Sequence, residues 1–247
     1  MAQDISGQTA VITGASRGIG RASAIALAKV GVNVAVTARN EEQLASLVQE
    51  CEALGVKAIA YPTDATDAES VYALRDKVIS DFGSVDILVN NAGVAKYAML
   101  GETTVEDYDW MMDTNMKSTF LFSNAFVPRM VEQKSGTVIF ISSQAGVNGF
   151  PNEAVYCATK HAQVGFAHAL DGEVRPHGVK VSIIAPGGVR TTFAFGTGRE
   201  DGMDALDGMS EANTVADAVV FASQADPKSR MLMIGMRPMS EPLYGGA

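Results

Sequence analysis

The start of the chain places a short β-type run, a glycine-rich turn and a helical pattern in immediate succession. The run is Thr9–Thr13, the turn has glycines at 14, 18 and 20, and the helical pattern continues to Gly31. In this arrangement the N–H groups of the turn and the positive end of the helix face a phosphate. Glycine allows positive φ angles and a close approach of the backbone to a pyrophosphate. The first thirty residues therefore favour a dinucleotide-binding fold.

Strand and helix patterns alternate along the rest of the chain. The β-type runs are residues 33–37, 57–61, 86–90, 137–141, 179–184 and 231–234; the helical patterns are 41–54, 68–82, 105–115, 117–132, a helix that carries Tyr156 and ends near Arg175, and 214–222. Run 137–141 is almost continuously apolar, as in a central parallel strand. The alternation predicts an α/β fold with a doubly wound, parallel, seven-stranded sheet and helices on both faces. Without a repeat or linker, we expect one domain over residues 1–247.

The net charge and the cysteine content indicate which cellular compartment and which classes of binding partner to expect. The net charge is -9, which argues against nucleic acid and anionic membranes as main partners. No run of 18 apolar residues suggests a membrane span, and the polar first seven residues lack the apolar core of a signal peptide. The two cysteines, Cys51 and Cys157, form no disulfide framework and fit a reducing compartment. We therefore expect a cytoplasmic protein, and no pattern indicates a metal site.

Tyr156 and Lys160 are four residues apart, so a helix places both on one face. A free tyrosine has a pKa of about 10, and a nearby ammonium lowers it by favouring the phenolate. General acids work best when their pKa lies near the working pH. The pair is predicted to protonate an oxygen or to deprotonate an alcohol. The alternative is a chance spacing on a helix surface.

The end of the second strand indicates which cofactor is preferred. An acidic residue there binds the ribose hydroxyls of NAD(H), whereas an arginine accommodates the 2′-phosphate of NADP(H). The chain has Ala38 followed by Arg39, and Arg17 in the glycine turn can reach the same region. Guanidinium groups pair well with phosphate oxygens, so we predict NADP(H). The alternative is two solvated surface arginines.

Two asparagine-containing segments are further candidates. Asn90-Asn91-Ala92-Gly93 ends the fourth strand, where open α/β sheets bind ligands, although an ordinary Asn/Gly turn also fits. Asn115 lies among apolar residues, and a buried asparagine must find hydrogen-bond partners. It is either a structural hydrogen-bonding residue or part of a proton path.

Residues 192–213 are rich in Gly, Asp and Met and show no periodicity. Such a segment is typical of a substrate loop or lid, and the alternative is a disordered surface loop. Four residues flank the motifs and are expected near the pocket: Phe150, Pro151, Phe193 and Phe195. They favour an apolar or aromatic ketone, unless they only fill the core.

Taken together, the motifs resemble the short-chain dehydrogenase/reductase family, in its branch of single-domain enzymes of about 250 residues. The motifs are Thr13-Gly14-x-x-x-Gly18-x-Gly20, Asn90-Asn91-Ala92-Gly93, Asn115, Ser143, Tyr156-x-x-x-Lys160 and Pro186-Gly187. They occur in the family's order and spacing over nearly the whole chain. The resemblance implies a three-layer Rossmann fold.

The resemblance also implies four catalytic residues. Tyr156 would be the general acid/base, and Lys160 would lower its pKa and hold the nicotinamide ribose. Ser143, 13 residues before the tyrosine, is preferred to its neighbour Ser142 as the donor to the substrate oxygen. Asn115 would anchor a water in the proton relay.

The cofactor contacts follow in the same way. Asp64 and Ala65 would contact the adenine, Asn91 would lie beside the ribose, and Val189 and Thr191 would contact the nicotinamide amide. The full predicted set is Gly14, Ser16, Arg17, Gly18, Ile19, Gly20, Arg39, Asp64, Ala65, Asn91, Ala92, Gly93, Tyr156, Lys160, Pro186, Gly187, Val189 and Thr191.

The predicted function is an NADP(H)-dependent oxidoreductase that interconverts a ketone or aldehyde and an alcohol. Two alternatives remain: an NADP(H)-binding sensor without turnover, and a lyase or epimerase that uses the same Tyr/Lys pair. The resemblance implies a homo-oligomer. Residues 235–247 lack the Asp-Gly-Gly ending common in the family, which leaves dimer and tetramer both open.

Overall fold

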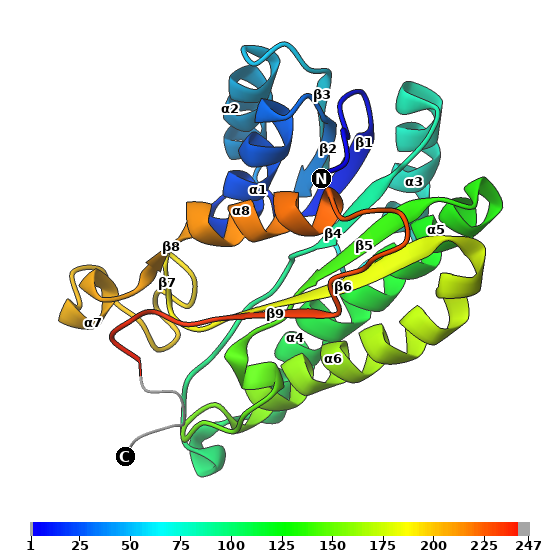
Figure 1. Ribbon diagram of the computed structural model, residues 1–247. Helices are drawn as coiled ribbons and strands as arrows, with labels where there is room; N and C mark the ends of the chain where they lie inside the picture. Colours follow the sequence, from blue (N-terminus) through cyan, green and yellow to red (C-terminus); the bar gives the residue numbers. More distant parts are fainter. Residues whose placement is uncertain (1, 242–247) are drawn as a thin grey trace.

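The computed structural model describes residues 2–241, apart from the side chain of Ala205. A seven-stranded parallel sheet with the order β3-β2-β1-β4-β5-β6-β9 forms its centre (Figure 1). The strands are β1 (Thr9–Thr13), β2 (Asn33–Ala38), β3 (Ala58–Pro62), β4 (Ile87–Asn90), β5 (Gly136–Ile141), β6 (Val179–Pro186) and β9 (Met233–Met236). The predicted α/β fold with a doubly wound sheet is confirmed.

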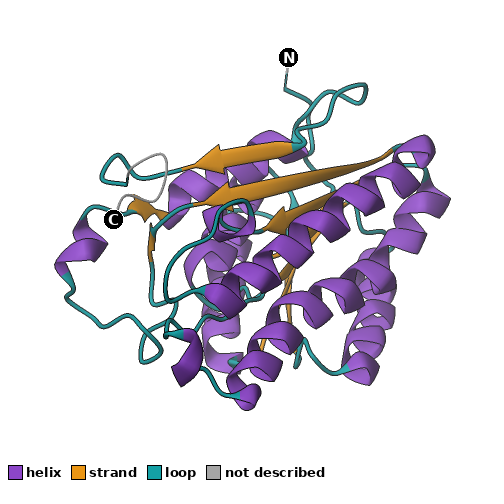
Figure 2. Ribbon diagram, turned by 90° about the horizontal axis from the view of Figure 1, so that it is seen from below, coloured by secondary structure: helices purple, strands orange, loops and turns teal. Residues whose placement is uncertain are grey.

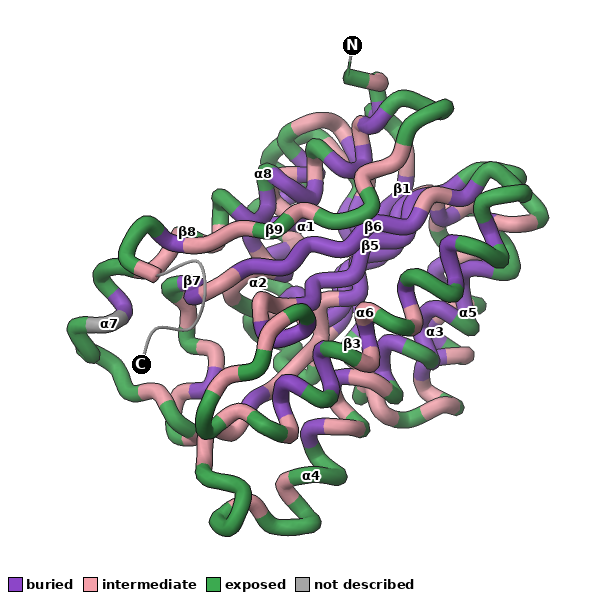
Figure 3. The backbone as a smooth tube through the Cα atoms, turned by 60° about the horizontal axis from the view of Figure 1, so that its bottom comes forward, coloured by how far each residue is buried: buried purple, intermediate pink, exposed green. Residues whose placement is uncertain are grey.

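The inner strands are buried on both faces because alternate side chains enter two different hydrophobic cores. In β5, Ile139 and Ile141 belong to one core, whereas Val138 and Phe140 belong to the other. Figure 3 shows burial concentrated along these strands. The continuous apolar pattern of the strand sequences is thus explained by two covered faces.

Two sets of helices cover the sheet (Figures 1 and 2). One set is α1 (Gly18–Lys29), α2 (Glu41–Glu52) and α8 (Ala212–Ser223), which supply the first core. The other is α3 (Ala68–Phe82), α5 (Ser118–Gln133) and α6 (Ala154–Val174), which supply the second. Further helical segments include α4 (Val105–Met112) and the short turns η1 (Leu100–Glu102), η3 (Gln144–Gly146) and η4 (Arg175–His177).

Side chains cap several helix N-termini but leave that of α1 open. Asn40 accepts from the Gln43 N–H, Asp67 accepts from the Ser70 N–H, and Thr104 forms a capping box with Asp107. Arg17 precedes α1 and makes no such hydrogen bond. The first N–H groups of α1 therefore remain available to a ligand.

Three local predictions need correction. The last strand lies at Met233–Met236 rather than 231–234, because its register is set by pairing of Ile183 with Met233. The helices predicted at 105–115 and 117–132 form one continuous stretch, joined by the π-helical turn η2 (Asp113–Lys117). Segment 192–213 contains the four-residue helix α7 (Asp204–Asp207) and β8 (Ser210–Glu211), which pairs with β7 (Val189–Arg190).

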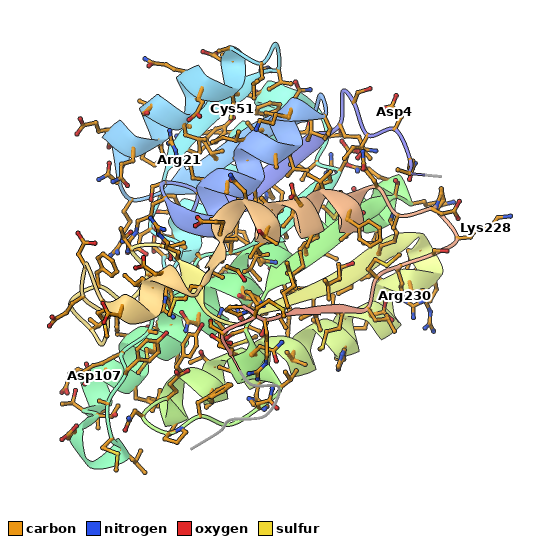
Figure 4. The ribbon with its side chains drawn as sticks, turned by 60° about the vertical axis from the view of Figure 1, so that its left-hand side comes forward. Asp4, Arg21, Cys51, Asp107, Lys228 and Arg230 are labelled. Atoms are coloured by element: carbon orange, nitrogen blue, oxygen red, sulfur yellow. The ribbon has the colours of Figure 1, made fainter. Side chains whose placement is uncertain are left out.

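Two ion pairs tie helices to their neighbours, and Figure 4 labels their arginines. Arg21 of α1 lies 2.7 Å from Glu50 of α2, and Arg230, in the loop before β9, lies 2.7 Å from Asp171 of α6. Of the unusual C-terminal segment 235–247, residues 242–247 lie outside the described part. Within residues 2–241, no helix is both long and apolar enough to cross a membrane.

Candidate active site

The carboxyl ends of the strands line one cavity of about 910 Å³. Its walls include Thr13 at the end of β1, Arg39 after β2, Asn91 after β4 and Pro186 at the end of β6. The strand order reverses between β1 and β4, and such a switch point is where doubly wound sheets bind ligands. At the other end the cavity reaches Phe193 in segment 192–213.

The glycine turn forms a cradle at the uncapped end of α1. Gly14 and Gly18 have φ angles of +62° and +57°, which side chains rarely adopt. A Cβ on Gly20 would overlap the Gly14 carbonyl oxygen, so Gly20 packs beneath the cradle and does not itself line the cavity. The first turn of α1 also holds no acidic residue. Free N–H groups and the helix dipole therefore fit the pyrophosphate of a dinucleotide.

Thr13 and Asn91 bond this cradle to the segment after β4. The Thr13 hydroxyl accepts from the N–H groups of Asn91 and Ala92, each at 2.9 Å. The Asn91 side-chain amide donates to the carbonyls of Thr13 at 2.8 Å and Gly14 at 3.1 Å. Asn91 lines the cavity as predicted, but its amide N–H groups hold the glycine turn in place. Thr13 was not predicted as a site residue, although it opens the glycine motif.

The two arginines assigned to the 2′-phosphate have different surroundings. Arg39 is exposed at the cavity edge beside Asp64. Hydrogen bonds from Thr66, with a smaller effect of the Arg39 charge, lower the pKa of Asp64. Arg17 donates to the Thr192 carbonyl oxygen at 2.9 Å and hydroxyl at 2.5 Å. The guanidinium of Arg17 is therefore engaged with segment 192–213, which leaves Arg39 as the better candidate for the phosphate.

Eight more predicted cofactor residues line the cavity together with these. They are Ser16, Ile19, Ala65, Ala92, Gly93, Gly187, Val189 and Thr191.

Helix α6 brings Tyr156 and Lys160 to the inner wall of the cavity. They are 6% and 4% exposed, and the Lys160 ammonium nitrogen lies 5.8 Å from the centre of the Tyr156 ring. Burial raises the pKa of Tyr156, and a hydrogen bond with Ser143 opposes this rise only in part. Burial lowers the pKa of Lys160 to about 7. The predicted lowering of the Tyr156 pKa is therefore wrong for this structure, because desolvation outweighs the Ser143 hydrogen bond and the charge of Arg199.

The two adjacent serines have separate tasks. Ser142 is buried and donates to the Lys160 carbonyl oxygen at 3.3 Å. Ser143 lines the cavity, and its oxygen accepts from the Ala145 N–H at 3.1 Å. Its side chain also hydrogen-bonds with Tyr156. This geometry favours Ser143 over Ser142 as the partner of a substrate oxygen.

Asn115 lies in the π-helical turn, is 0% exposed and does not line the cavity. Its side chain accepts from the Val94 N–H at 2.7 Å and donates to the Val94 carbonyl and the Thr159 hydroxyl, each at 2.9 Å. Its backbone carbonyl accepts from the Thr119 hydroxyl and the Gln163 amide. Other groups of the protein thus bond the side chain and the backbone carbonyl of Asn115, the residue that was predicted to anchor a relay water.

The substrate end of the cavity combines aromatic and charged side chains. Phe150 and Phe193 line it as predicted, whereas Pro151 and Phe195 do not. Sequence reasoning missed Tyr97, whose ring meets that of Tyr156 edge-on at 6.1 Å between ring centres. Four charged residues were also missed: Glu153, Arg199, Arg237 and Glu241.

Glu153 stands out among these charged residues. Burial raises its pKa to about 7, although the charge of Arg199 opposes the rise. Its position three residues before Tyr156, one helical turn away, was the available sequence signal. In the described part of the chain, no group of three or more His, Cys, Asp or Glu side chains could hold a metal ion.

Comparisons with known proteins agree with this geometry. A model of the short chain dehydrogenase family matches residues 8–201. The 3-oxoacyl-[acyl-carrier-protein] reductase FabG of Staphylococcus aureus is 40% identical over 181 residues, 73% of this chain and 74% of that protein. The reductase of the same name from Thermotoga maritima is 33% identical over 187 residues, 76% of each chain.

Solved structures show the same relationship. A metagenomic short-chain oxidoreductase in complex with NADP superimposes with a TM-score of 0.83 at 32% identity, over 97% of this chain and 100% of that one. An alcohol dehydrogenase from the archaeon Thermococcus sibiricus, complexed with 5-hydroxy-NADP, gives a TM-score of 0.88 at 29% identity, over 96% and 99%. A short chain dehydrogenase from Mycobacterium paratuberculosis bound to NAD gives 0.85 at 29% identity, over 94% and 97%. The chain belongs to the short-chain dehydrogenase family of oxidoreductases.

Proposed function

We propose that this protein is an NADP(H)-dependent reductase that interconverts a ketone or aldehyde and the corresponding alcohol. One observation carries the proposal: the Tyr156 and Ser143 side chains share one cavity with the uncapped glycine turn and Arg39. A nicotinamide cofactor in this cavity would supply the hydride. The chain itself must bind the carbonyl compound, orient it and supply a proton.

Tyr156 is suited to give that proton. Because burial raises its pKa, the phenol stays protonated at neutral pH, and the protonated form is the one that acts as an acid. Ser143 accepts the Ala145 N–H at its oxygen and hydrogen-bonds with Tyr156, and its hydroxyl would turn its proton to the substrate oxygen when a carbonyl compound binds. Lys160 lies beside Tyr156, where it would hold the cofactor ribose. This arrangement favours reduction over alcohol oxidation.

The preference for NADP(H) rests on the end of β2. An exposed arginine follows Ala38, and no carboxylate occupies the position that would bind free ribose hydroxyls. Two similar solved structures hold NADP or a derivative of it, and one holds NAD.

The substrate proposal combines the cavity with the relatives. Phe150, Phe193 and Tyr97 favour an apolar or aromatic carbonyl compound, and the curated relatives act on 3-oxoacyl groups. We place the protein in the cytoplasm as a dimer or tetramer. Apolar side chains exposed on α4 and α5, among them Val105, Trp110 and Phe120, support self-association, which light scattering would test.

The decisive experiment follows absorbance of the reduced nicotinamide with aryl ketones, aldehydes and a 3-oxoacyl thioester, using NADPH and NADH in parallel. Oxidation of NADPH by one of these carbonyl compounds supports the proposal. Tight NADPH binding with no oxidation in the whole panel favours the sensor. Conversion of a substrate without net loss of NADPH favours a lyase or epimerase.

A further inference from the structure

Gln163 is a fully buried polar residue that the mechanism above does not use. It is 0% exposed and lies one helical turn after Lys160 on α6, against the π-helical turn at Asp113–Lys117. A buried amide needs hydrogen-bond partners, so the identity of those partners shows what it holds.

The side chain of Gln163 bridges Lys160 and Asn115. Its Oε1 accepts from the Lys160 ammonium nitrogen at 2.9 Å. Its Nε2 donates to the Asn115 carbonyl oxygen at 2.9 Å and to the Thr119 hydroxyl oxygen at 2.7 Å. These bonds connect α6 with residues 44 and 48 positions earlier in the chain.

The chemistry of these partners fixes the orientation of the amide. A lysine ammonium only donates hydrogen bonds, and a carbonyl oxygen only accepts them. The Thr119 hydroxyl gives its own proton to the Asn115 carbonyl at 2.7 Å, so it is free to accept from Gln163. A flipped amide would put donor against donor and acceptor against acceptor.

The same bonds account for the protons of Lys160. Of its three N–H groups, one bonds the Ile141 carbonyl at 3.0 Å and one bonds Gln163. No acceptor among residues 2–241 takes the third, which remains for the cavity side. Gln163 is therefore one of the two hydrogen-bond acceptors that orient the Lys160 ammonium.

The groups around Lys160 leave few competing charges. Tyr156 faces it from α6, the Ile141 carbonyl from β5, Gly93 from the segment after β4, and Gln163 from the next turn of α6. Tyr156 is the titratable group in this set, and desolvation is the cause that lowers the Lys160 pKa. The Gln163 Oε1 and the Ile141 carbonyl oxygen are the two acceptors that face the ammonium.

We propose that Gln163 is a positioning residue: it fixes the Lys160 ammonium to the Asn115 carbonyl through its side chain and decides how readily Lys160 keeps its proton. The catalytic consequence rests on the proposed reductase function, whereas the effect on Lys160 does not. The amide donates to the Asn115 carbonyl oxygen, and Asn115 is the residue that the resemblance expects to anchor a relay water.

Two substitutions of Gln163 should change the proton affinity of Lys160 in opposite directions. Gln163→Met keeps the length but removes the acceptor, so Lys160 should bind its proton roughly tenfold more weakly. Gln163→Glu places a carboxylate at the same point, so Lys160 should bind its proton at least about tenfold more tightly. Thr119→Val removes the hydroxyl that accepts from the Gln163 amide and donates to the Asn115 carbonyl, and it should act like Gln163→Met, but more weakly.

The test is an NMR titration of the lysine side-chain carbon next to the ammonium, in full-length protein labelled on lysine, with the Lys160 signal assigned by its absence in Lys160→Arg. Gln133→Met is the matched control, because Gln133 donates to the Val85 carbonyl at 3.2 Å far from the cavity. Opposite shifts of the Lys160 midpoint in the two Gln163 variants support the proposal. An unmoved midpoint, or shifts of the same sign, overturns it; if Gln163→Met does not fold, Gln163→Glu and Thr119→Val give the same decision.

A second readout is the pH dependence of the reduction rate in the same variants. If the Lys160 titration midpoints shift while no carbonyl compound is reduced, the effect of Gln163 on Lys160 is supported and the proposed reductase function fails. If reduction proceeds and its pH profile is identical in all variants, the positioning role fails.

Discussion

The ring of Tyr156 is buried against the rings of Tyr97 and Phe193. A phenol in such a place resists ionisation, because the phenolate would lose its solvation. This environment explains at the scale of one residue why the site favours proton donation.

Tyr156→Phe removes this proton donor and keeps the ring. We expect the rate of carbonyl reduction to fall by about 10² to 10⁴-fold, the usual contribution of a general acid, with NADPH affinity nearly unchanged. Steady-state rates and NADPH titration measure the two effects. Tyr72→Phe is the control, because it loses a hydroxyl bonded to Asn124 outside the cavity. Normal turnover in Tyr156→Phe would contradict the assignment.

Arg39→Ala tests the cofactor preference. A lost charge-assisted bond to phosphate should weaken NADPH binding by roughly tenfold or more and leave NADH binding nearly constant. Fluorescence titration with both cofactors measures the difference. Arg21→Ala serves as the control, since Arg21 pairs with Glu50 outside the cavity (Figure 4). Equal weakening of both cofactors would remove the preference for NADP(H).

Glu153 links the cavity to stability. Its pKa is raised from 4.5 to about 7, so the native state binds the proton more tightly than the unfolded chain. Between these two values the native state therefore loses stability as pH rises. Glu153→Gln should raise the melting temperature relative to the parent at about pH 8 and have little such benefit at about pH 4. Thermal unfolding at both pH values measures this, with Glu52→Gln on the surface of α2 as the control; an equal effect at both pH values would refute it.

Single residues differed in how far the sequence alone could place them. Tyr156, Lys160, Ser143 and the glycines stand in a recognisable spacing, and each of them except Gly20 lines the cavity. Gln163 gave no such signal, because its bonds depend on how α6 packs against residues 48 positions away. The direction of the Tyr156 pKa could not be predicted for the same reason: burial is a property of the folded molecule.

At the scale of elements, the open N-terminus of α1 distinguishes this helix from α2, α3 and α4, which have side-chain caps. The caps and their absence can be read directly from the sequence, because Asn, Asp and Thr are the preferred capping residues. The π-helical turn could not be read in this way, since it depends on the contacts of Asn115 with Val94 and Thr159. The strand β9 was misplaced by two residues because its run of methionines lacks alternation, so only pairing with β6 fixes it.

Gly20→Ala tests the glycine cradle. The new methyl would overlap the Gly14 carbonyl oxygen and lie 2.5 Å from the Asn91 amide nitrogen. We expect a loss of about 1–3 kcal/mol in stability together with weaker NADPH binding. Denaturant unfolding and cofactor titration measure the two effects.

The control is another helical glycine, Gly172 of α6, where a methyl would meet nothing within 4 Å. Gly172→Ala should be neutral or slightly stabilising, because alanine favours the helix. If Gly20→Ala behaves like Gly172→Ala, the cradle is not as tight as the structure indicates.

At the scale of the whole molecule, the sheet and its two helical layers follow from the alternation of patterns in the sequence. Each strand and helix can be predicted from residues that are neighbours in the sequence. The handedness of strand connections then leaves few ways to assemble these elements into a sheet. The mixed polarity of the substrate end is different. Glu153, Arg199 and Arg237 come from three separate segments that meet only in the folded chain. The sequence therefore predicted the aromatic residues of the substrate end but not its charged ones.

The bond from Arg17 to Thr192 joins the glycine turn, where the pyrophosphate would bind, to the segment beside the substrate end. Any ligand that changes the position of Arg17 must also change the free energy of segment 192–213. Linkage requires the reverse effect to be equal, so a carbonyl compound resting on that segment alters cofactor affinity by the same factor. We therefore expect the two halves of the cavity to be coupled, so that the affinity measured for either ligand depends on whether the other is already bound.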